Sequence, residues 1–219
     1  MHYGRFIVFA LAAVATCSAN AAGLGLRAGS TGVGVDIGFG IAPTLSARIG
    51  YSGLKFDTEV STTDVNYDTK VKLSNPSGLI DWSPLGPFRI TAGIVGANGR
   101  ADLTGTPSGG TFTINGISYQ ASDIGSLSGS VKAGKSAAPY LGFGYGNVAG
   151  AGVNFYFDVG VIFQGSPKVS LTANCGPALT PGQCTALQGD VEAERRKLED
   201  DLSKYKYYPV VNIGVTIGF

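Results

Sequence analysis

The sequence predicts an all-β protein, an eight-stranded antiparallel transmembrane β-barrel, from its composition and from the spacing of its apolar residues. The 219 residues include 34 glycines and only 14% charged residues, and the mean hydropathy is +0.18. A soluble domain carries about 25% charged residues. Beyond residue 20 no run of about 18 apolar residues could form a membrane-spanning helix. A closed barrel is the other structure that satisfies every backbone polar group in lipid.

Charge excludes one class of partner. Lys and Arg number 16 and Asp and Glu number 15, so the net charge is close to zero. A nucleic-acid binder needs a basic surface to neutralise phosphates. We therefore expect no nucleic-acid partner.

Residues 1–21 have the order of a secretory signal peptide. Arg5 supplies the positive start, residues 6–15 form a short apolar core, and residues 19–21 read Ala-Asn-Ala, a small-residue cleavage site. We expect residues 22–219 to form the exported barrel domain, located in the cell outer membrane.

Cysteine usage agrees with export. The stretch ending in Thr16 and Cys17 also suggests a lipoprotein cleavage site that would lipidate Cys17, although Thr16 fits that pattern poorly. Removal of the signal takes away His2, the single histidine, and leaves Cys175 and Cys184 as an even pair. An even pair in an exported chain predicts a disulfide, here across an external loop. Two thiols without histidine supply only half of a tetrahedral zinc shell, so we expect no metal and no cofactor.

Eight strands are expected in chain order, because apolar residues alternate with small or polar ones. The alternation is clear in residues 33–40, where Val33 and Val35 alternate with Gly34 and Asp36, and it recurs near Leu45, Val153 and Val211. The first strand is short and is included because bacterial barrels have even strand numbers. The expected strands are residues 24–30, 33–40, 44–57, 66–82, 88–104, 130–146, 151–170 and 207–219.

The connections alternate between short and long. Residues 41–43, 83–87 and 146–152 are short connections, and long polar stretches lie at 54–70, 99–135 and 166–206. Outer-membrane barrels have short periplasmic turns and long external loops, so the short connections should face the periplasm.

Two elements are expected within the long loops. Asn115-Gly116 lies between two short alternating stretches and predicts a β-hairpin. After Cys184, apolar residues recur at helical spacing among charged ones, which predicts a short amphipathic helix lying over the barrel mouth with a solvated charged face. These apolar residues are Leu187, Val191, Leu198 and Leu202.

Five charged residues of the strands are predicted to face the lumen. Pairing around each short turn places Asp36 opposite Arg48, Asp81 opposite Arg89, and Asp158 opposite Tyr140. The same arithmetic places three pairs on the lipid face, Ile80 with Ile90, Trp82 with Phe88 and Phe143 with Phe155.

The lumen has two interpretations. An eight-stranded barrel is just wide enough to be filled by its own side chains, and paired charges there would form a structural plug. Alternatively, Gly142, Gly144, Gly160 and Gly214 leave space for a constricted polar path, or equally for Arg and Tyr from the opposite wall.

The C-terminus carries a resemblance. Val211, Ile213, Val215, Ile217 and Phe219 end the chain at every second position, a pattern that looks like the recognition signal of the outer-membrane barrel assembly machinery. With the signal peptide and the strand pattern, the chain resembles small Gram-negative outer-membrane β-barrel proteins of the OmpX, OmpW and OmpA-transmembrane type. Residues 79–84 and 163–167 look like stretches of proteobacterial barrels of this size. The resemblance implies a monomer whose partners are outer-membrane lipid and the assembly machinery.

Three function classes follow, in order of preference. The first is a structural or interaction protein of the envelope with its loops presented outside, and the second is a narrow passive channel for small solutes. An enzyme is last, because barrel enzymes of the outer membrane use histidine as base or orienting group, and the mature chain has none. Only a carboxylate-only hydrolase would remain, so we expect no catalytic residues.

Overall fold

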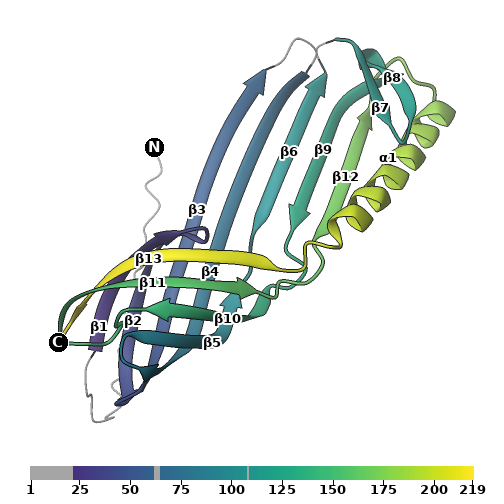
Figure 1. Cartoon of the computed structure of the whole chain (residues 1–219). Helices are drawn as coiled ribbons and strands as arrows, with labels where there is room; N and C mark the ends of the chain where they lie inside the picture. The colour runs from purple at the N-terminus through teal and green to yellow at the C-terminus, as the bar shows by residue number, and fades with distance from the viewer. Residues whose placement is uncertain (1–21, 62–64, 108) are drawn as a thin grey trace.

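The computed structural model describes residues 22–61, 65–107 and 109–219. The predicted signal peptide, residues 1–21, and Cys17 within it lie outside the described residues. The described chain contains thirteen strands, one α-helix and a 3-10 turn, Ala121–Asp123 (Figure 1). Among the described residues, no helix is both long enough and apolar enough to cross a membrane. The strands are β1 (Ala22–Gly29), β2 (Gly32–Ala42), β3 (Leu45–Ser61), β4 (Val65–Leu85), β5 (Phe88–Gly96), β6 (Arg100–Pro107), β7 (Thr111–Ile114), β8 (Ile117–Gln120), β9 (Ile124–Lys132), β10 (Ala137–Tyr145), β11 (Gly152–Ile162), β12 (Lys168–Cys175) and β13 (Tyr208–Gly218).

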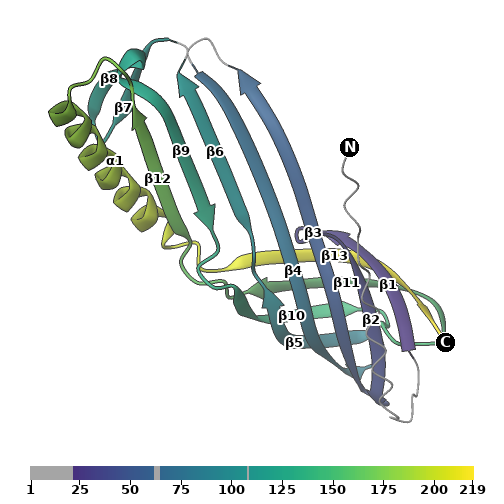
Figure 2. The same cartoon turned by 180° about the vertical axis from the view of Figure 1, so that it is seen from behind.

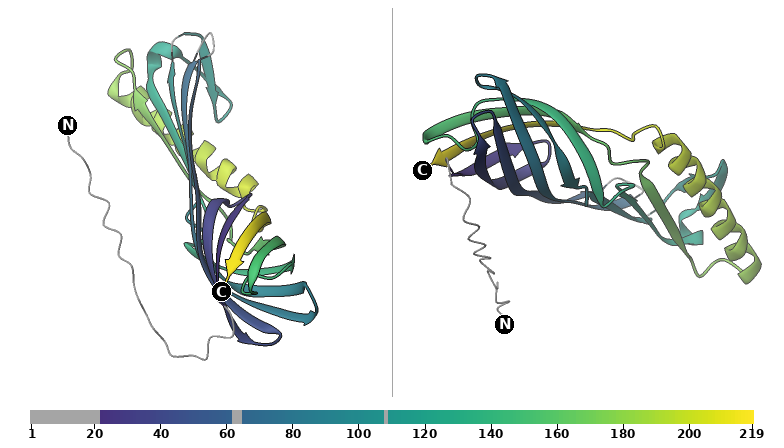
Figure 3. Two further views of the ribbon diagram at one scale, coloured as in Figure 1. Left: turned by 90° about the vertical axis from the view of Figure 1, so that its left-hand side faces the viewer. Right: turned by 90° about the horizontal axis from the view of Figure 1, so that it is seen from below.

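Antiparallel pairing closes one group of strands into a ring. The pairs run from β1 through β2, β3, β4, β5, β10, β11 and β13, and β13 returns to pair with β1. The weakly marked first strand is therefore present as β1, between β2 and β13. Figure 3 shows the curvature of this ring from two further directions.

The long polar stretches are mostly strands rather than irregular loops, which corrects the prediction. β3 and β4 continue beyond the ring, and the far half of β4 pairs with β6, which pairs with β9, which pairs with β12 (Figure 2). These five strands form a sheet that we call the extension. The predicted total of eight strands was too low for the whole chain, because each of three predicted long strands contains two.

Each of these three strands breaks where the ring meets the extension. The breaks are residues 97–99, 133–136 and 163–167. Their backbone groups bond to one another: Ala97 N–H donates to Ser136 O at 2.9 Å, and Lys135 N–H donates to Gln164 O at 2.8 Å. These hydrogen bonds thus satisfy backbone polar groups at the place where the closed ring ends and the open sheet begins.

Along the ring strands, exposure alternates as the sequence predicts. In β2 the residues Gly34, Asp36 and Gly38 face inward, whereas Val35 and Ile37 are exposed. The same alternation runs through β10, where Leu141 and Phe143 are exposed. The outer surface of the ring is therefore apolar and its interior polar, the reverse of a soluble protein.

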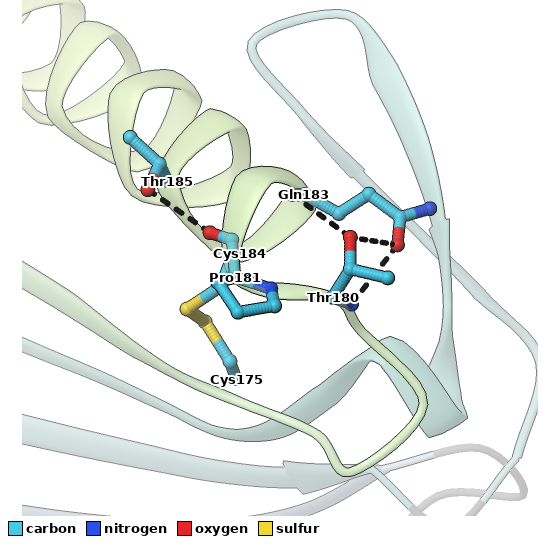
Figure 4. The surroundings of a disulfide bond; sticks show 6 residues. All are labelled: Cys175, Thr180, Pro181, Gln183, Cys184 and Thr185. Carbon is cyan, nitrogen blue, oxygen red and sulfur yellow. Dashed lines mark hydrogen bonds between the residues drawn. A yellow bond between two sulfur atoms is a disulfide. The ribbon is translucent and has the colours of Figure 1, made fainter.

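Helix α1 (Pro181–Leu202) lies beside β12, at the edge of the extension (Figure 1). Thr180 caps it, accepting a hydrogen bond from Gln183 N–H, and the predicted disulfide between Cys175 and Cys184 is confirmed, with Cα atoms 5.7 Å apart (Figure 4). The helix is longer than predicted. It packs on β12 and β7, not over the barrel mouth, because its apolar side meets a second core. That core consists of Ile114, Ile124, Ala173, Leu187 and Val191.

The predicted hairpin is confirmed as β7 and β8. Asn115 and Gly116 have φ of 53° and 81°, the left-handed values that a two-residue type I′ turn requires. Tyr119 Oη donates to Asp190 Oδ2 at 2.5 Å, and Asn115 Nδ2 donates to Asp190 Oδ1 at 3.1 Å. The hairpin is thereby fixed to α1.

Candidate functional site

The interior of the ring contains six buried charged side chains, three arginines and three aspartates. All are at most 6% exposed, and they come from six different strands. They include all five residues that the sequence predicted to face the lumen. We call these six residues the charge cluster: Arg27, Asp36, Arg48, Asp81, Arg89 and Asp158.

Four members of the cluster form a closed square. Arg48 contacts Asp81 at 3.2 Å and Asp158 at 2.7 Å. Arg89 contacts the same two carboxylates, at 3.3 Å and 2.8 Å. Each buried charge therefore meets two of opposite sign, which offsets the cost of removing it from water.

The remaining pair joins the square through a tyrosine. Arg27 lies 3.1 Å from Asp36, and Tyr156 Oη donates to Asp36 Oδ2 at 2.6 Å. The ring of Tyr156 also lies 5.4 Å from the Arg48 guanidinium and 5.5 Å from that of Arg89, within the range of cation–π attraction. The whole interior is thus one connected, charge-balanced network.

Two of the predicted partners are wrong. Asp36 lies opposite Gly50 in the strand register and pairs with Arg27 instead of Arg48. Asp158 lies opposite Gly144 instead of Tyr140, and its carboxylate contacts two arginines.

Turn geometry explains these differences. Asp81 contacts Arg89 as expected but lies opposite Thr91 in the register. All three hairpins turn later than the sequence suggested. β2–β3 turns at residues 43–44 and β4–β5 at 86–87, with a bulge beside each turn, and the pairing of β10 with β11 is centred on residue 151. Each register therefore shifts by an even number of residues, which changes partners and keeps each side chain on its predicted face.

The predicted lipid-face partners shift for the same reason. Ile80 lies opposite Ala92, and Trp82 lies opposite Ile90. Phe143 lies opposite Val159.

Arg27 is the site residue that sequence reasoning missed. It alternates with Leu26 and Ala28, so its inward direction was visible in the pattern. Its role was not visible, because the partner Asp36 is found only through the pairing of β1 with β2.

The space beside the lumenal glycines is filled by tyrosines from the same strand or from the adjacent strand, not from the opposite wall. A Cβ on Gly142 or Gly160 would lie 2.4 or 2.5 Å from Tyr140 Oη, and one on Gly214 would lie 2.3 Å from the ring of Tyr156. Space that could have formed a polar path is therefore occupied by tyrosine.

Apolar residues close the lumen on both sides of the cluster. At the short-turn end the connection 146–151 folds inward: Val148 is 1% exposed, and Thr216 Oγ1 donates to Asn147 O at 3.2 Å. At the extension end, buried apolar side chains form a layer, and a cavity of about 20 Å³ remains between this layer and the cluster, space for about one water. The layer consists of Leu79, Val95, Ala97, Ala138, Tyr140, Ile162 and Val210.

No known protein family matches the sequence, and no relative is found among curated proteins. The chain is similar to the crystal structure of Acinetobacter baumannii CarO2, with a TM-score of 0.60 and 24% identity over 91% of this chain and 98% of that one. It is also similar to Acinetobacter baumannii CarO, with a TM-score of 0.58 and 25% identity over 90% of this chain and 97% of that one. These two comparisons support the fold, a closed antiparallel β-barrel.

A major outer membrane protein from Thermus thermophilus has a TM-score of 0.39 and 14% identity over 90% of this chain and 99% of that one, a likeness too low to carry an argument. The comparisons do not single out the OmpX, OmpW or OmpA type. Within residues 22–61, 65–107 and 109–219, no group of three or more His, Cys, Asp or Glu could hold a metal ion.

Proposed function

We propose that the ring of eight strands spans the outer membrane as a closed anchor and that the extension stands outside the cell as an interaction surface. The observation that carries the proposal is the filled lumen. The strands close a ring around a charge-balanced cluster that has apolar layers on both sides. Such a filled ring can act as a structural anchor and has no open path for solutes.

Strand length and surface chemistry support the membrane position. β2, β11 and β13 have 11 residues each, and a tilted transmembrane strand needs about 9–11. Their outward side chains are apolar, as lipid requires. The short connections would face the periplasm and the extension would project outward.

We further propose that residues 1–21 direct export, that residues 22–219 form the barrel domain, and that the C-terminal apolar pattern delivers a monomer to the assembly machinery. The cluster does not suit a carboxylate-only enzyme, because all three of its aspartates contact arginines.

A narrow passive channel is the second candidate. A hollow of about 830 Å³ opens between the three short connections and leads to the segment that carries Val148. Inward movement of solute from this hollow would require that segment and the cluster to rearrange.

Conductance across planar lipid bilayers separates the two candidates. The anchor proposal predicts no stepwise openings of the native protein. A porin with a water-filled lumen, measured in the same bilayers, serves as the positive control. Reproducible native openings that Gly144→Leu abolishes would establish the channel instead.

A further inference from the structure

The outer face of the extension continues the lipid-facing side of the ring. β3 and β4 run without interruption from one into the other. Because side chains alternate along a strand, Lys55 lies on the same side as the outward-facing Ile49 and Tyr51. The opposite face of the extension carries Leu171 and Ala173, which pack toward α1.

Five basic residues lie directly opposite one another on this outer face. Lys55 pairs with Lys72, and Lys72 pairs with Arg100. Arg100 pairs with Lys132, and Lys132 pairs with Lys168. One basic residue therefore comes from each strand of the extension, at a single level, across about 19 Å. We call this set the cationic row: Lys55, Lys72, Arg100, Lys132 and Lys168, all exposed.

Such a row is unfavourable for the sheet by itself, because like charges directly opposite each other destabilise strand pairing. Asp57 lies 3.4 Å from Lys55, and Asp102 lies 2.6 Å from Arg100, so two members have a nearby acid. Within the described ranges the other three members make no ion pair. The row thus retains an excess of positive charge.

The next row on the same face has a different composition, so the basic charge is confined to one level. There Asp57 lies opposite Lys70, and Lys70 lies opposite Asp102. Ser130 and Ser170 complete that row. A generally basic surface would not produce this contrast.

The cationic row lies where the ring gives way to the extension. Arg100 and Lys168 are the first residues of β6 and β12, and Lys132 is the last of β9, so all three border the breaks. Tyr51, an exposed aromatic residue of the ring, is four residues before Lys55, about 13 Å along the strand. Membrane barrels carry girdles of aromatic residues at the lipid–water interface, so the position of Tyr51 near the end of the ring supports a row at the level of the headgroups.

We propose that the cationic row binds the phosphate groups of anionic lipid headgroups in the outer leaflet of the membrane that holds the ring. Lysine and arginine near such a surface gain favourable electrostatic energy, and the phosphates remove the repulsion within the row. The row would thereby fix the height and tilt of the extension above the membrane. This inference rests on the proposed position of the ring in the outer membrane.

The test uses the full mature chain in uncharged detergent micelles, with diphosphoryl lipid A added as the probe and bound lipid counted by native mass spectrometry. The variant K72Q/K132Q removes two charges on either side of Arg100. The matched control R196Q/K197Q removes two charges from an exposed part of α1. Lipid affinity should fall about 25-fold in K72Q/K132Q, about five-fold per lysine, and stay unchanged in the control. Binding by the native chain should also weaken as salt is added.

Three outcomes would overturn the proposal. Equal lipid affinity in the two variants would show that the row is not the site. Binding of dephosphorylated lipid A as tight as that of the diphosphoryl form would exclude phosphate recognition. Competition by inorganic phosphate at the concentration of the lipid phosphate would indicate a free-anion site.

The variant itself also reports on folding. Without lipid, K72Q/K132Q should unfold at the same temperature as the native chain or higher, because it relieves like-charge repulsion. A lower unfolding temperature would show that the lysines are structural, and would refute the proposal. These measurements in micelles test the lipid site alone. The proposed function is tested separately by cell fractionation, in which recovery of the protein outside the outer membrane would refute it.

Discussion

Arg48 on β3 reaches across the interior of the ring to Asp158 on β11, with Nη1 2.7 Å from Oδ2, although the residues are 110 positions apart in the chain. Their strands are not neighbours in the sheet. The contact exists because the sheet closes on itself, and it links opposite walls of the ring.

Arg48→Met should therefore destabilise the ring strongly. Asp81 and Asp158 would share Arg89 alone, and breaking a buried ion pair by removing one partner costs about 3–5 kcal/mol. The free energy of unfolding in urea, followed by the migration difference of folded and unfolded barrel on gels, measures the loss. The double variant R48M/D158N, which leaves a neutral Arg89–Asp81 pair, should lose less than the sum of its single changes. Strict additivity would argue against the square.

Gly214→Ala should destabilise the ring from inside. Its Cβ would lie 2.3–2.4 Å from two ring atoms of Tyr156 and 2.6 Å from the Tyr156 hydroxyl, and overpacking of this kind costs about 1–3 kcal/mol. Gly78→Ala is the matched control, because a Cβ there meets nothing within 4 Å and Gly78 faces outward. Thermal unfolding in detergent compares the two. Equal losses would mean that the strands, not the filled lumen, respond to the substitution.

The contact between the hairpin and α1 should weaken in strong alkali. Burial, together with the hydrogen bond to Asp190, raises the pKa of Tyr119 to about 12. A pKa raised by folding gives stability that is complete below the unfolded value, about 10, and is lost as the pH rises through about 12. The unfolding temperature of the native chain should fall over this window more than that of Tyr119→Phe. The difference in tyrosinate absorbance between the two proteins should have its midpoint near pH 12, and a midpoint near 10 would contradict the assignment.

The same hydrogen bond acts on the acid side. Donation from Tyr119 and then from Asn115 lowers the pKa of Asp190. A lowered carboxyl pKa gives stability that is present above the ordinary value and lost as the pH falls through the folded one. Tyr119→Phe should therefore also reduce the acid-dependent loss of stability.

Phe219→Ser should separate assembly from stability. The side chain is 82% exposed, and the backbone bonds between Phe219 and Ala22 need no side chain. Loss of one apolar group at the membrane rim costs about 0–1 kcal/mol, so refolding and thermal stability in micelles should hardly change. Abundance in the outer membrane should fall sharply if Phe219 is read as an assembly signal. Normal abundance in cells would show that it is only a lipid-facing residue.

The sequence by itself determined which face each residue of the ring strands takes. The alternation of period two is local, since it follows from the direction of successive Cβ atoms along a strand. Asp36, Asp81 and Asp158 were therefore placed inside from neighbouring residues alone, and the structure buries all three. The Asn115-Gly116 hairpin and the Cys175–Cys184 disulfide also depended on local or compartment signals, and both are present.

Only the tertiary structure decided partners and the extension. Ion pairs such as Arg27 with Asp36 depend on bulges and turn positions, which shift a register without changing the alternation. Short alternating stretches recur directly after the breaks, in β6, β9 and β12, so the alternation by itself did not show where ring strands end and extension strands begin. That boundary is set by which strand edge each segment pairs with: the ring half of β4 pairs with β5, and its far half pairs with β6. Pairing between distant segments is a property of the folded chain, and a local pattern of apolar residues does not specify it.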